Sequence, residues 1–459
     1  MQTAERVHTE HDATQCAEAK SQETRLKVLM LAFACGPGRG SEPGQGWQFA
    51  CGMARHHDVW VLVYSGFRKT IERELSERPV AGLHVAYYRL PLEHVRHWRD
   101  GADRHGLPEQ LHYYLWNLGA ADVARSLHAE VGFDLVHHVS FMRYWSPSAA
   151  AAVDAPFLWG PVGGGESAPK AFYPSFGWRG HLFERARDLA RALAHFDPFV
   201  RRTAQRATLT LATTEQSAER IRKLGGERMD VRGAVALNNE EIERLAELPA
   251  SCSGAIRFVS VGRLLHWKGY ELGLRAFARA LSKDKDSSKS ALTDAEYWII
   301  GDGPERARLE AVAKKLEIAD CVKFLGLLPR SEVLTRLSKT HVIVHPSFHD
   351  SGGFATLEGM AAGRPAICLA LGGPGLQVTS DCGIVIPVES PEQVIDDLSA
   401  AMLLLATDPE RREKMGSAAR RRVAQQFSWD ALITDVREQY IKLATRARFV
   451  SAAGASHTE

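Results

Sequence analysis

The chain has 459 residues, of which 45% are hydrophobic and 24% are charged; these are globular values for a chain long enough to form two domains. The formal net charge of +2 gives no support for a nucleic-acid-binding domain, which would be strongly basic. No apolar run reaches the roughly 18 residues of a spanning helix, and the polar first 25 residues predict no secretory signal. The seven cysteines form no C-x-x-C pair, which argues against a zinc site or disulfide framework and favours a reducing cytosol.

The first half of the chain has the pattern of a parallel α/β sheet. Residues 1–24 lack hydrophobic periodicity and are expected to be a disordered tail. The strand RLKVLMLAFA (25–34) is followed by a glycine-rich loop, a helix from Trp47 to Arg55 and the buried strand DVWVLVY (58–64). A helix from about Glu109 to Val131 follows later. The other predicted strands are LHVAYYRL (83–90), DLVHHVS (134–140) and APFLWGPV (155–162).

A second series of short apolar runs begins near Ile256, and amphipathic helical segments separate most of them. The runs are IRFVSVGR (256–263), EYWIIGDG (296–303), CVKFLGLL (321–328), HVIVHPS (341–347), PAICLAL (365–371) and GIVIPV (383–388). The sequence therefore predicts two α/β units in series, joined between about residues 215 and 254. The most linker-like segments are ELPASCSGA (247–255) and KDKDSSKSALTD (283–294).

Glycine-rich loops follow several of these strands, at the sheet edge where ligands bind in open parallel sheets. In CGPGRGSEPGQGW (35–47) the glycines allow a close approach of the backbone to an anion or sugar. No frame of this loop supplies G-x-G-x-x-G, so we discount an NAD enzyme. A tight turn without a ligand is the alternative.

The loop VGRLLHWKG (261–269) places Arg263 and Lys268 five residues apart, where both can converge on one anion. As isolated residues they would more often be solvated surface cations. In HDSGGFATLEGMAAGRP (349–365), a loop leads into a helix that Gly363 and Pro365 terminate. Taken alone, Asp350 would cap the turn and Glu358 would complement the helix dipole.

Taken together, these segments resemble a family. Four segments match, in order and spacing, the C-terminal domain of the family 4 (group 1) glycosyltransferases: VGRLLHWKG (261–269), IIGDGPERARLE (299–310), VKFLGLLPRSEV (322–333) and HPSFHDSGGFATLEGMAAGRPAI (345–367). Four others are also similar to it: GSEPGQGW (40–47), FDLVHH (133–138), WGPVGGG (159–165) and FSWDALITDVREQY (427–440). The resemblance covers about residues 26–445.

The resemblance implies an α/β GT-B fold, in which two Rossmann-like, doubly wound domains face a central cleft. The expected division is a disordered tail (1–24), an acceptor-side domain (25–235), a nucleotide-sugar-binding domain (236–425), a C-terminal helix packed back on the first domain (426–447) and a second disordered tail (448–459). It also implies a retaining, metal-independent hexosyltransferase of polysaccharide biosynthesis. The donor would be a nucleotide sugar such as a UDP- or GDP-hexose, which is a substrate, so no cofactor is expected.

The family's paired-carboxylate motif, E-x7-E, falls on Asp350 and Glu358. Glu358 would accept hydrogen bonds from the ribose, and Asp350, one methylene shorter than the usual Glu, would face the donor sugar. Arg263 and Lys268 would hold the diphosphate, whose negative charge grows in the transition state. The other implied donor contacts are Gly262, Leu325, Gly326, Gly352, Gly353, Phe354, Thr356 and Leu357. The implied acceptor or phosphate loops contain Gly44, Gly46, Gly163 and Gly164.

A front-face mechanism is usually inferred for this family, so the donor phosphate would take the acceptor proton. The family commonly has a histidine near the reacting sugar, and we slightly favour His138 over His137 for this place. The D-x-D string at Asp284 to Asp286 lies in a charged segment that we interpret as a solvated loop and not a metal site.

The segment 176–207 contains apolar residues at helical spacing opposite Arg187 and Arg191. A basic amphipathic helix can lie on an anionic membrane, which would suit a lipid-linked acceptor. Because Glu184 and Asp188 alternate with the arginines, we favour a helix packed on its own domain with i,i+3 ion pairs. Peripheral contact with the inner face of the cell membrane stays open for this otherwise cytoplasmic protein.

The acceptor would be a hydroxyl of a glycan, of a lipid-linked sugar or of a small molecule. Two other functions fit the same fold. A nucleotide-sugar 2-epimerase would need no acceptor, and a non-catalytic nucleotide-sugar-binding protein would bind the donor without transfer. Glycosyl transfer is the first choice, because Arg263, Lys268 and Glu358 are all present.

Overall fold

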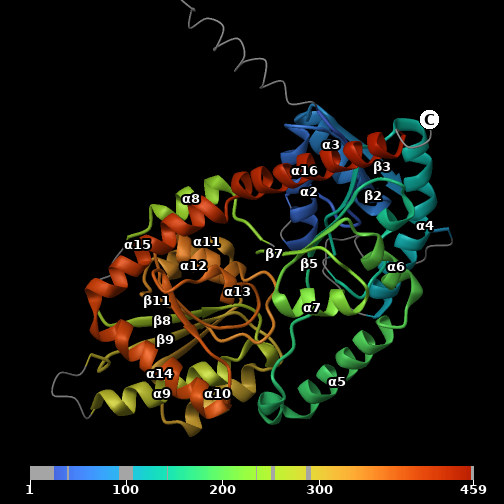
Figure 1. Cartoon of the computed structure of the whole chain (residues 1–459). Helices are drawn as coiled ribbons and strands as arrows, with labels where there is room; N and C mark the ends of the chain where they lie inside the picture. Colours follow the sequence, from blue (N-terminus) through green and yellow to red (C-terminus); the bar gives the residue numbers. More distant parts are fainter. Residues whose placement is uncertain are drawn as a thin grey trace, which may run out of the picture.

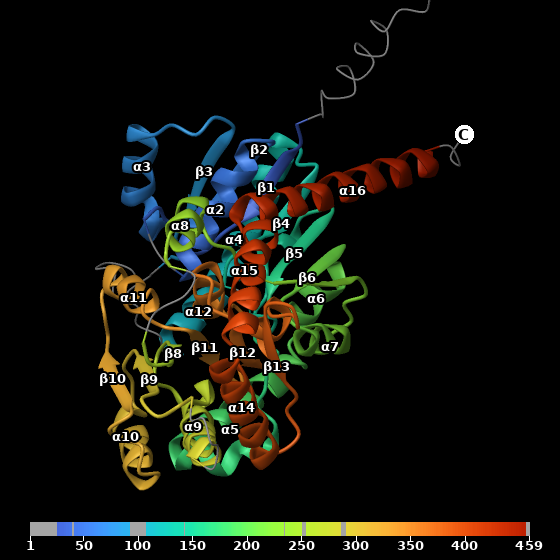
Figure 2. The ribbon, with the colours of Figure 1, turned by 90° about the vertical axis from the view of Figure 1, so that its left-hand side faces the viewer.

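The computed structural model describes residues 25–38, 41–91, 107–141, 143–233, 235–249, 254–285 and 291–455. The tail predicted at 1–24 and the last four residues of the tail predicted at 448–459 lie outside these ranges. Two bodies, each built on one parallel sheet, lie one above the other in Figure 2 and side by side in Figure 1. This confirms the predicted α/β class.

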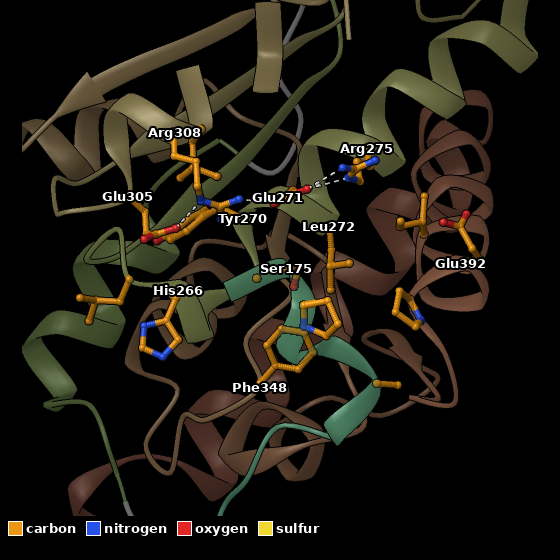
Figure 3. Close-up of a pocket in the computed structure, with 17 residues that line it drawn as sticks. Ser175, His266, Tyr270, Glu271, Leu272, Arg275, Glu305, Arg308, Phe348 and Glu392 are labelled. Atoms are coloured by element: carbon orange, nitrogen blue, oxygen red, sulfur yellow. Dashed lines mark hydrogen bonds and ion pairs between the residues drawn. The ribbon is translucent and has the colours of Figure 1, made fainter. Parts of the chain in front are cut away.

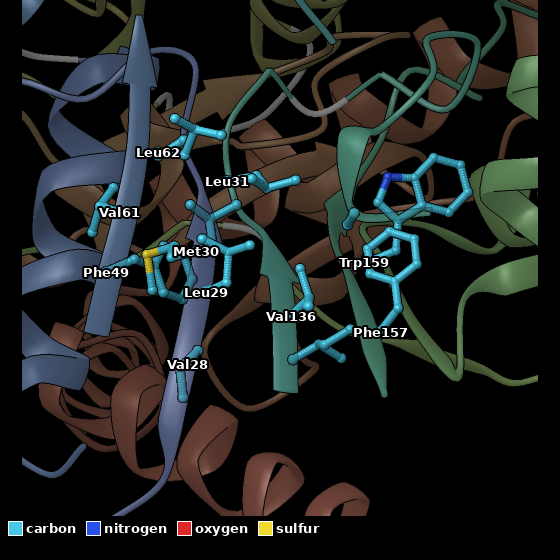
Figure 4. Close-up of a cluster of buried hydrophobic side chains, with 14 of the residues drawn as sticks. Val28, Leu29, Met30, Leu31, Phe49, Val61, Leu62, Val136, Phe157 and Trp159 are labelled. Atoms are coloured by element: carbon cyan, nitrogen blue, oxygen red, sulfur yellow. The ribbon is translucent and has the colours of Figure 1, made fainter. Parts of the chain in front are cut away.

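The first body contains a seven-stranded sheet with the order β3-β2-β1-β4-β5-β6-β7. Its strands are β1 (Lys27–Leu31), β2 (Asp58–Tyr64), β3 (Leu83–Tyr88), β4 (Leu135–His138), β5 (Phe157–Val162), β6 (Leu209–Ala212) and β7 (Met229–Val231). The central strands are buried along nearly their whole length, because helices cover both faces of the sheet. Figure 4 shows the resulting core, in which residues of β1, β2, β4 and β5 pack with Phe49.

The second body contains a six-stranded sheet with the order β10-β9-β8-β11-β12-β13. Its strands are β8 (Arg257–Val261), β9 (Glu296–Ile300), β10 (Val322–Gly326), β11 (Val342–His345), β12 (Ala366–Leu369) and β13 (Gly383–Ile386). In each sheet the strand order reverses between two neighbours, β1 and β4 in the first and β8 and β11 in the second. Ligand sites of doubly wound sheets form beyond the carboxyl ends of such strand pairs.

The helices fall into the same two groups. Those of the first body are α2 (Ser41–Ala54), α3 (Arg68–Glu77), α4 (Leu107–Val131), α5 (Gly177–Ala194), α6 (Pro198–Arg206) and α7 (Glu215–Lys223). Those that follow are α8 (Asn239–Ala246), α9 (Tyr270–Lys285), α10 (Arg306–Lys315), α11 (Arg330–Leu337), α12 (Phe354–Ala361), α13 (Gly372–Gln377), α14 (Pro391–Thr407), α15 (Pro409–Gln426) and α16 (Trp429–Ala455). Short 3₁₀ turns are η1 (Ser65–Phe67), η2 (Ala149–Ala152), η3 (Lys170–Phe176) and η4 (His266–Lys268).

Helix α16 returns from the second body to the first (Figure 1). The Trp429 ring packs edge-on against Phe49, and the Tyr440 hydroxyl lies 2.6 Å from Nδ1 of His137. This is the packing expected for the C-terminal helix. The helix was predicted to end at residue 447, but it continues to Ala455, so residues 448–455 are not the tail that we expected.

Three further features differ from the sequence-based expectations. Strands β6 and β7 were not predicted, because Thr210 and Asp230 interrupt their short apolar runs. Helix α2 begins at Ser41, so Gly44 and Gly46 lie in a helix and not in the predicted loop. The 3₁₀ turn η3 belongs to the first half of the chain, yet its Phe172 packs into the core of the second body, with its ring 4.8 Å from that of Phe348.

Candidate functional site

The loops after β8 and β11 meet at the strand-order reversal of the second sheet and are held together by backbone contacts. Phe348 N donates a hydrogen bond of 2.9 Å to the carbonyl of Trp267. Gly269 has a φ of +66°, and a Cβ atom at this position would lie 1.9 Å from the carbonyl oxygen of Pro346. Only glycine fits here, because the site demands both a left-handed backbone and the absence of a side chain. The two loops therefore have a fixed register.

This register brings Lys268 and Asp350 together. The Nζ atom of Lys268 lies 2.5 Å from Oδ2 of Asp350, and Nε2 of His345 lies 2.9 Å from the same oxygen. The other carboxylate oxygen accepts a 2.9 Å hydrogen bond from Gly353 N. Burial alone would raise the pKa of Asp350, but the Lys268 ammonium and the hydrogen bond from His345 hold this pKa well below its usual range. Asp350 is therefore a fixed anion that positions Lys268.

Arg263 lies in the same loop as Lys268 but has a different environment. Its side chain is exposed and makes no hydrogen bond or ion pair with the described residues. The loop that carries it packs tightly on its neighbours, since Gly262 N donates to Ile300 O and Gly301 N donates to Gly326 O. The carboxyl ends of β8, β9 and β10 thus lie together, and Leu325 and Gly326 belong to the same edge.

Glu358 lies in α12, which starts directly after the Asp350 loop at Gly353, where φ is +67°. The side chain is buried, and its Oε1 accepts a 2.5 Å hydrogen bond from Nη1 of Arg330. Burial raises the pKa of Glu358, and Arg330 opposes this shift. Oε2 accepts no hydrogen bond from the described residues, which leaves one carboxylate oxygen for a ligand. The helix ends as predicted, with Gly363 in a left-handed conformation before Pro365.

The start of α12 contains the remaining predicted donor contacts. Gly352 O accepts a 2.5 Å hydrogen bond from Nε2 of Gln377, which fixes the loop before Phe354. Thr356 and Leu357 are both fully buried, and the Thr356 hydroxyl has no hydrogen-bond partner. These two side chains support the helix from inside, so any contact with a ligand would come through their backbone.

The glycine loop after β5 in the first body reaches the same region. A Cβ atom on Gly163 would lie 2.9 Å from the hydroxyl oxygen of Ser351, so this loop touches the Asp350 loop of the second body. Gly164, with φ of +85°, packs against Trp145, and its carbonyl accepts a 2.5 Å hydrogen bond from Arg191. Gly46 packs on the carbonyl of Ala34 in the loop after β1. The structure thus brings Gly163 and Gly164 to the site and places Gly44 and Gly46 at the strand-order reversal of the first sheet.

The tandem histidines His137 and His138 are buried at the end of β4. Nε2 of His138 lies 2.9 Å from the Tyr113 hydroxyl and from Ser140 O, and Nδ1 lies 2.8 Å from the Ser148 hydroxyl. His137 is held by Tyr440 and by the carbonyl of Gly160. Burial lowers the pKa of His138 to about 4 and that of His137 to about 3. Both rings are neutral and hydrogen-bonded within the first body, so neither is open to an acceptor in this structure.

The sequence did not reveal a cluster of polar side chains that joins the two bodies. Glu184 of α5 is fully buried, and its carboxylate lies 3.0 Å from Nε2 of His266 and 3.5 Å from Nε2 of His349. Arg187, one turn further along α5, lies 2.6 Å from Nδ1 of His349. His349 directly precedes Asp350, so α5 contacts the loop that carries Asp350. The alternation of acidic and basic residues in α5 predicted ion pairs, but it could not show that histidines of the other body share them.

A cavity of about 240 Å³ lies on the far side of the β8 loop, between η3 and helices α9 and α10 (Figure 3). Its charges neutralise each other: Glu271 pairs with both Arg275 and Arg308, and Arg308 also pairs with Glu305. None of the predicted donor contacts lines it. Both of its arginines are already paired, whereas Arg263 of the β8 loop pairs with none of the described residues, so the cavity is a weaker candidate for a phosphate site than that loop.

Asp284 differs from its expected role as part of a solvated loop. It is buried, and its carboxylate accepts hydrogen bonds from Ala291 N and Leu292 N, so it closes the end of α9. Asp286 lies outside the described residues. Within the described ranges, no group of three His, Cys, Asp or Glu side chains is arranged to hold a metal ion. The helices that the structure describes include none with the length and apolar character needed to cross a bilayer.

Comparison with known proteins identifies relatives of both halves. The family described as "Glycosyl transferases group 1" matches residues 249–422, and the family described as "Glycosyl transferase 4-like domain" matches residues 40–233. A D-inositol 3-phosphate glycosyltransferase from Kribbella flavida is 32% identical over 178 residues, which are 38% of this chain. The match spans only about two fifths (41%) of the length of that relative.

Solved structures show the same fold over nearly the whole chain. A sucrose-phosphate synthase from Thermosynechococcus elongatus has a TM-score of 0.59 at 17% identity and covers 92% of this chain and 100% of its own. The Anabaena protein HepE, solved in complex with UDP and glucose, has a TM-score of 0.53 at 15% identity and covers 91% of this chain and 100% of its own. At these identities the likeness establishes the two-domain GT-B fold. With two family models matched in succession across both bodies, the chain belongs to the family 4 (group 1) glycosyltransferases.

Proposed function

We propose that the protein transfers a hexose-type sugar from a nucleotide-sugar donor to a hydroxyl of a glycan, lipid-linked or small-molecule acceptor. It does so without a metal ion and with retention of the anomeric configuration. The observation that carries the proposal is the pair of cations in the β8 loop. Lys268 is held in place by Asp350, and Arg263 of the same loop is exposed and pairs with none of the described residues. Two positive charges in one loop at a strand-order reversal suit a diphosphate leaving group.

The remaining contacts support this donor pose. The free Oε2 of Glu358 is available to ribose hydroxyls, while Arg330 holds Oε1. The carboxyl end of β10, at Leu325 and Gly326, offers backbone groups to a base. HepE binds UDP and glucose on the same fold, which supports a nucleotide sugar as donor.

A direct front-face reaction fits the state of the nearby carboxylate. Both oxygens of Asp350 already accept hydrogen bonds, from Lys268, His345 and Gly353, so Asp350 is poorly suited to attack the sugar as a nucleophile. The buried His138 is equally unsuited to act as a base. The oxygen of the departing phosphate then takes the acceptor proton, while Arg263 and Lys268 stabilise the remaining negative charge. We place the reaction in the cytoplasm, which the five unpaired cysteines among the described residues support.

A panel of nucleotide sugars tests the donor class by thermal stabilisation, because a ligand that binds only the folded form raises its apparent stability. We expect at least one UDP- or GDP-hexose to raise the melting temperature of the wild type. The Arg263→Ala variant should show a clearly smaller increase, and the exposed Lys414→Ala variant an unchanged one. Isomerisation of the donor alone would indicate the epimerase, and no stabilisation by any nucleotide sugar would contradict the proposal.

A further inference from the structure

Helix α5 buries polar side chains and exposes large apolar ones, which is the reverse of an ordinary surface helix. Its polar side chains Glu184 and Arg191 are buried against the rest of the protein, with exposures of 0% and 3%. Its large apolar side chains face outward instead. Of the exposed large hydrophobic residues among those described, more than half lie in α5, the turn after it and the start of α6: Trp178 (72%), Leu182 (62%), Phe183 (47%), Leu189 (61%), Leu193 (63%), Phe196 (78%) and Phe199 (49%). Phe183 differs from the others, because its ring stacks on that of Trp267 in the second body. We call the other six residues the α5 apolar face.

Helix α5 lies at the periphery of the molecule, along its lower right edge in Figure 1. The spacing of Trp178, Leu182, Leu189 and Leu193 places them within one narrow stripe of the helix. On the neighbouring α4, the hydroxyl of Tyr114 donates a 2.7 Å hydrogen bond to Asp197, which directly follows Phe196. A contiguous apolar surface of this kind marks an interaction site.

The charges around the face identify its partner. Arg179, Arg185, Arg201 and Arg202 are exposed along it. The three carboxylates of residues 177–202 are already engaged: Glu184 with His266, Asp188 with Arg191, and Asp197 with the first amides of α6. The exposed rim is therefore cationic, and it surrounds Trp, Phe and Leu side chains. This combination is characteristic of a helix that lies in the interface of an anionic bilayer.

A cavity of about 460 Å³ opens beside the same face and is also cationic. Phe196 belongs to both. The cavity is lined by Lys170, Arg191, His195, Arg220 and Lys223, with Asp188 as its single carboxylate. The side chains of Lys170 and Lys223 pair with no described residue, and Nε of the buried Arg191 has no hydrogen-bond partner. Such a site suits a phosphate group.

We propose that the α5 apolar face docks on a membrane that contains anionic phospholipid, and that the cavity lined by Lys170 and Lys223 receives a headgroup phosphate. The apolar side chains enter the acyl boundary, and the exposed arginines contact neighbouring headgroups. Because Arg187 on the opposite side of α5 contacts His349, docking orients the Asp350 loop relative to the membrane. The surface is separate from the donor contacts, so the inference does not depend on the reaction.

Vesicle flotation with the full chain tests the inference. The wild type should float with phosphatidylcholine vesicles that contain phosphatidylglycerol and much less with phosphatidylcholine alone. Leu189→Asp combined with Leu193→Asp should weaken the partitioning by at least about tenfold, because two apolar contacts are lost and negative charge is added. Leu404→Asp, an exposed leucine on α14, is the matched control and should float like the wild type. Lys170→Ala combined with Lys223→Ala should abolish the preference for phosphatidylglycerol.

Circular dichroism and a cooperative thermal transition show that each variant is folded, and the Leu189→Gln and Leu193→Gln pair provides a milder change should the aspartates impair folding. Failure of the wild type to float with any vesicle would overturn the inference, as would equal flotation of wild type and both leucine pairs. A dimer that dissociates in the Leu189 and Leu193 variants, without flotation of the wild type, would assign the face to a second copy instead.

Discussion

Nζ of Lys268 lies 2.5 Å from Oδ2 of Asp350, although 82 residues separate them in the sequence. The contact exists because Gly269 lets the β8 loop pack against the carbonyl of Pro346 at the start of the β11 loop. Asp350 therefore fixes the position of the Lys268 ammonium.

Asp350→Asn should lower turnover by about tenfold or more, because a neutral amide no longer holds the Lys268 ammonium at the donor phosphate. Asp350→Glu keeps the charge and should retain more activity than Asp350→Asn. Steady-state kinetics of both variants, with folding checked by circular dichroism, provide the comparison. Equal activity of the two variants would mean that the charge of residue 350 does not matter.

Glu358→Gln should weaken donor binding by roughly 10- to 100-fold, the value of a hydrogen bond to a charged group. The amide keeps one acceptor oxygen in place of two, and it loses its ion pair with Arg330. Calorimetric titration with a nucleoside diphosphate measures the change. An unaltered dissociation constant would remove Glu358 from the nucleotide site.

Gly269→Ala should destabilise the protein more than Gly132→Ala does, although both glycines have similar φ angles of +66° and +69°. A Cβ atom at Gly269 collides with Pro346 O, whereas nothing lies within 4 Å of one at Gly132. A left-handed backbone costs a non-glycine residue about 1 kcal/mol, so the Gly132 variant isolates that cost. Chemical denaturation of the two variants gives the difference, and equal losses would show that the loops are not tightly packed.

Stability should fall as the pH is lowered from 7 to 5. His137 and His138 have pKa values lowered by burial to about 3 and about 4, so they stay neutral in the folded state at pH 5. In the unfolded chain they take up protons below about 6.5, so the unfolded state binds more protons in this range. Stability is then present above about pH 6.5 and is lost below it, by about 2 kcal/mol per histidine at pH 5.

Urea unfolding at the two pH values measures this loss. Asp350 does not offset it, because its lowered pKa adds a pH dependence only below the ordinary value of 3.8. A free energy of unfolding that stays constant between pH 7 and pH 5 would contradict the burial of the two neutral imidazoles.

The sequence predicted the features that depend on local pattern. Apolar runs located eleven of the thirteen strands that the structure describes, and the loops after β8 and β11 could be singled out because glycines and polar residues follow those strands. Strands β6 and β7 were missed because Thr210 and Asp230 leave no continuous apolar run in them. The stop of α12 at Gly363 was equally local, since glycine and proline act on their own turn.

Long-range relationships could not be read in this way. The spacing of Arg263 and Lys268 indicated an anion site, but not that Asp350 already binds Lys268. The tandem histidines suggested an imidazole that is accessible to the reacting sugar. Their ring nitrogens are instead hydrogen-bonded to Tyr113, Ser148 and Tyr440 on other elements. Periodicity showed two faces of α5 but not which one points inward, because that depends on His266 and His349 of the other body.

The most direct test of the proposed function is turnover of a nucleotide sugar with an acceptor, followed by NMR of the anomeric proton of the product. The wild type and Lys414→Ala should release nucleoside diphosphate and form a product with the donor's anomeric configuration. Arg263→Ala and Lys268→Ala should each reduce turnover by about 100- to 1,000-fold while the protein stays folded. Near wild-type turnover in both variants, or a product of inverted configuration, would contradict the account.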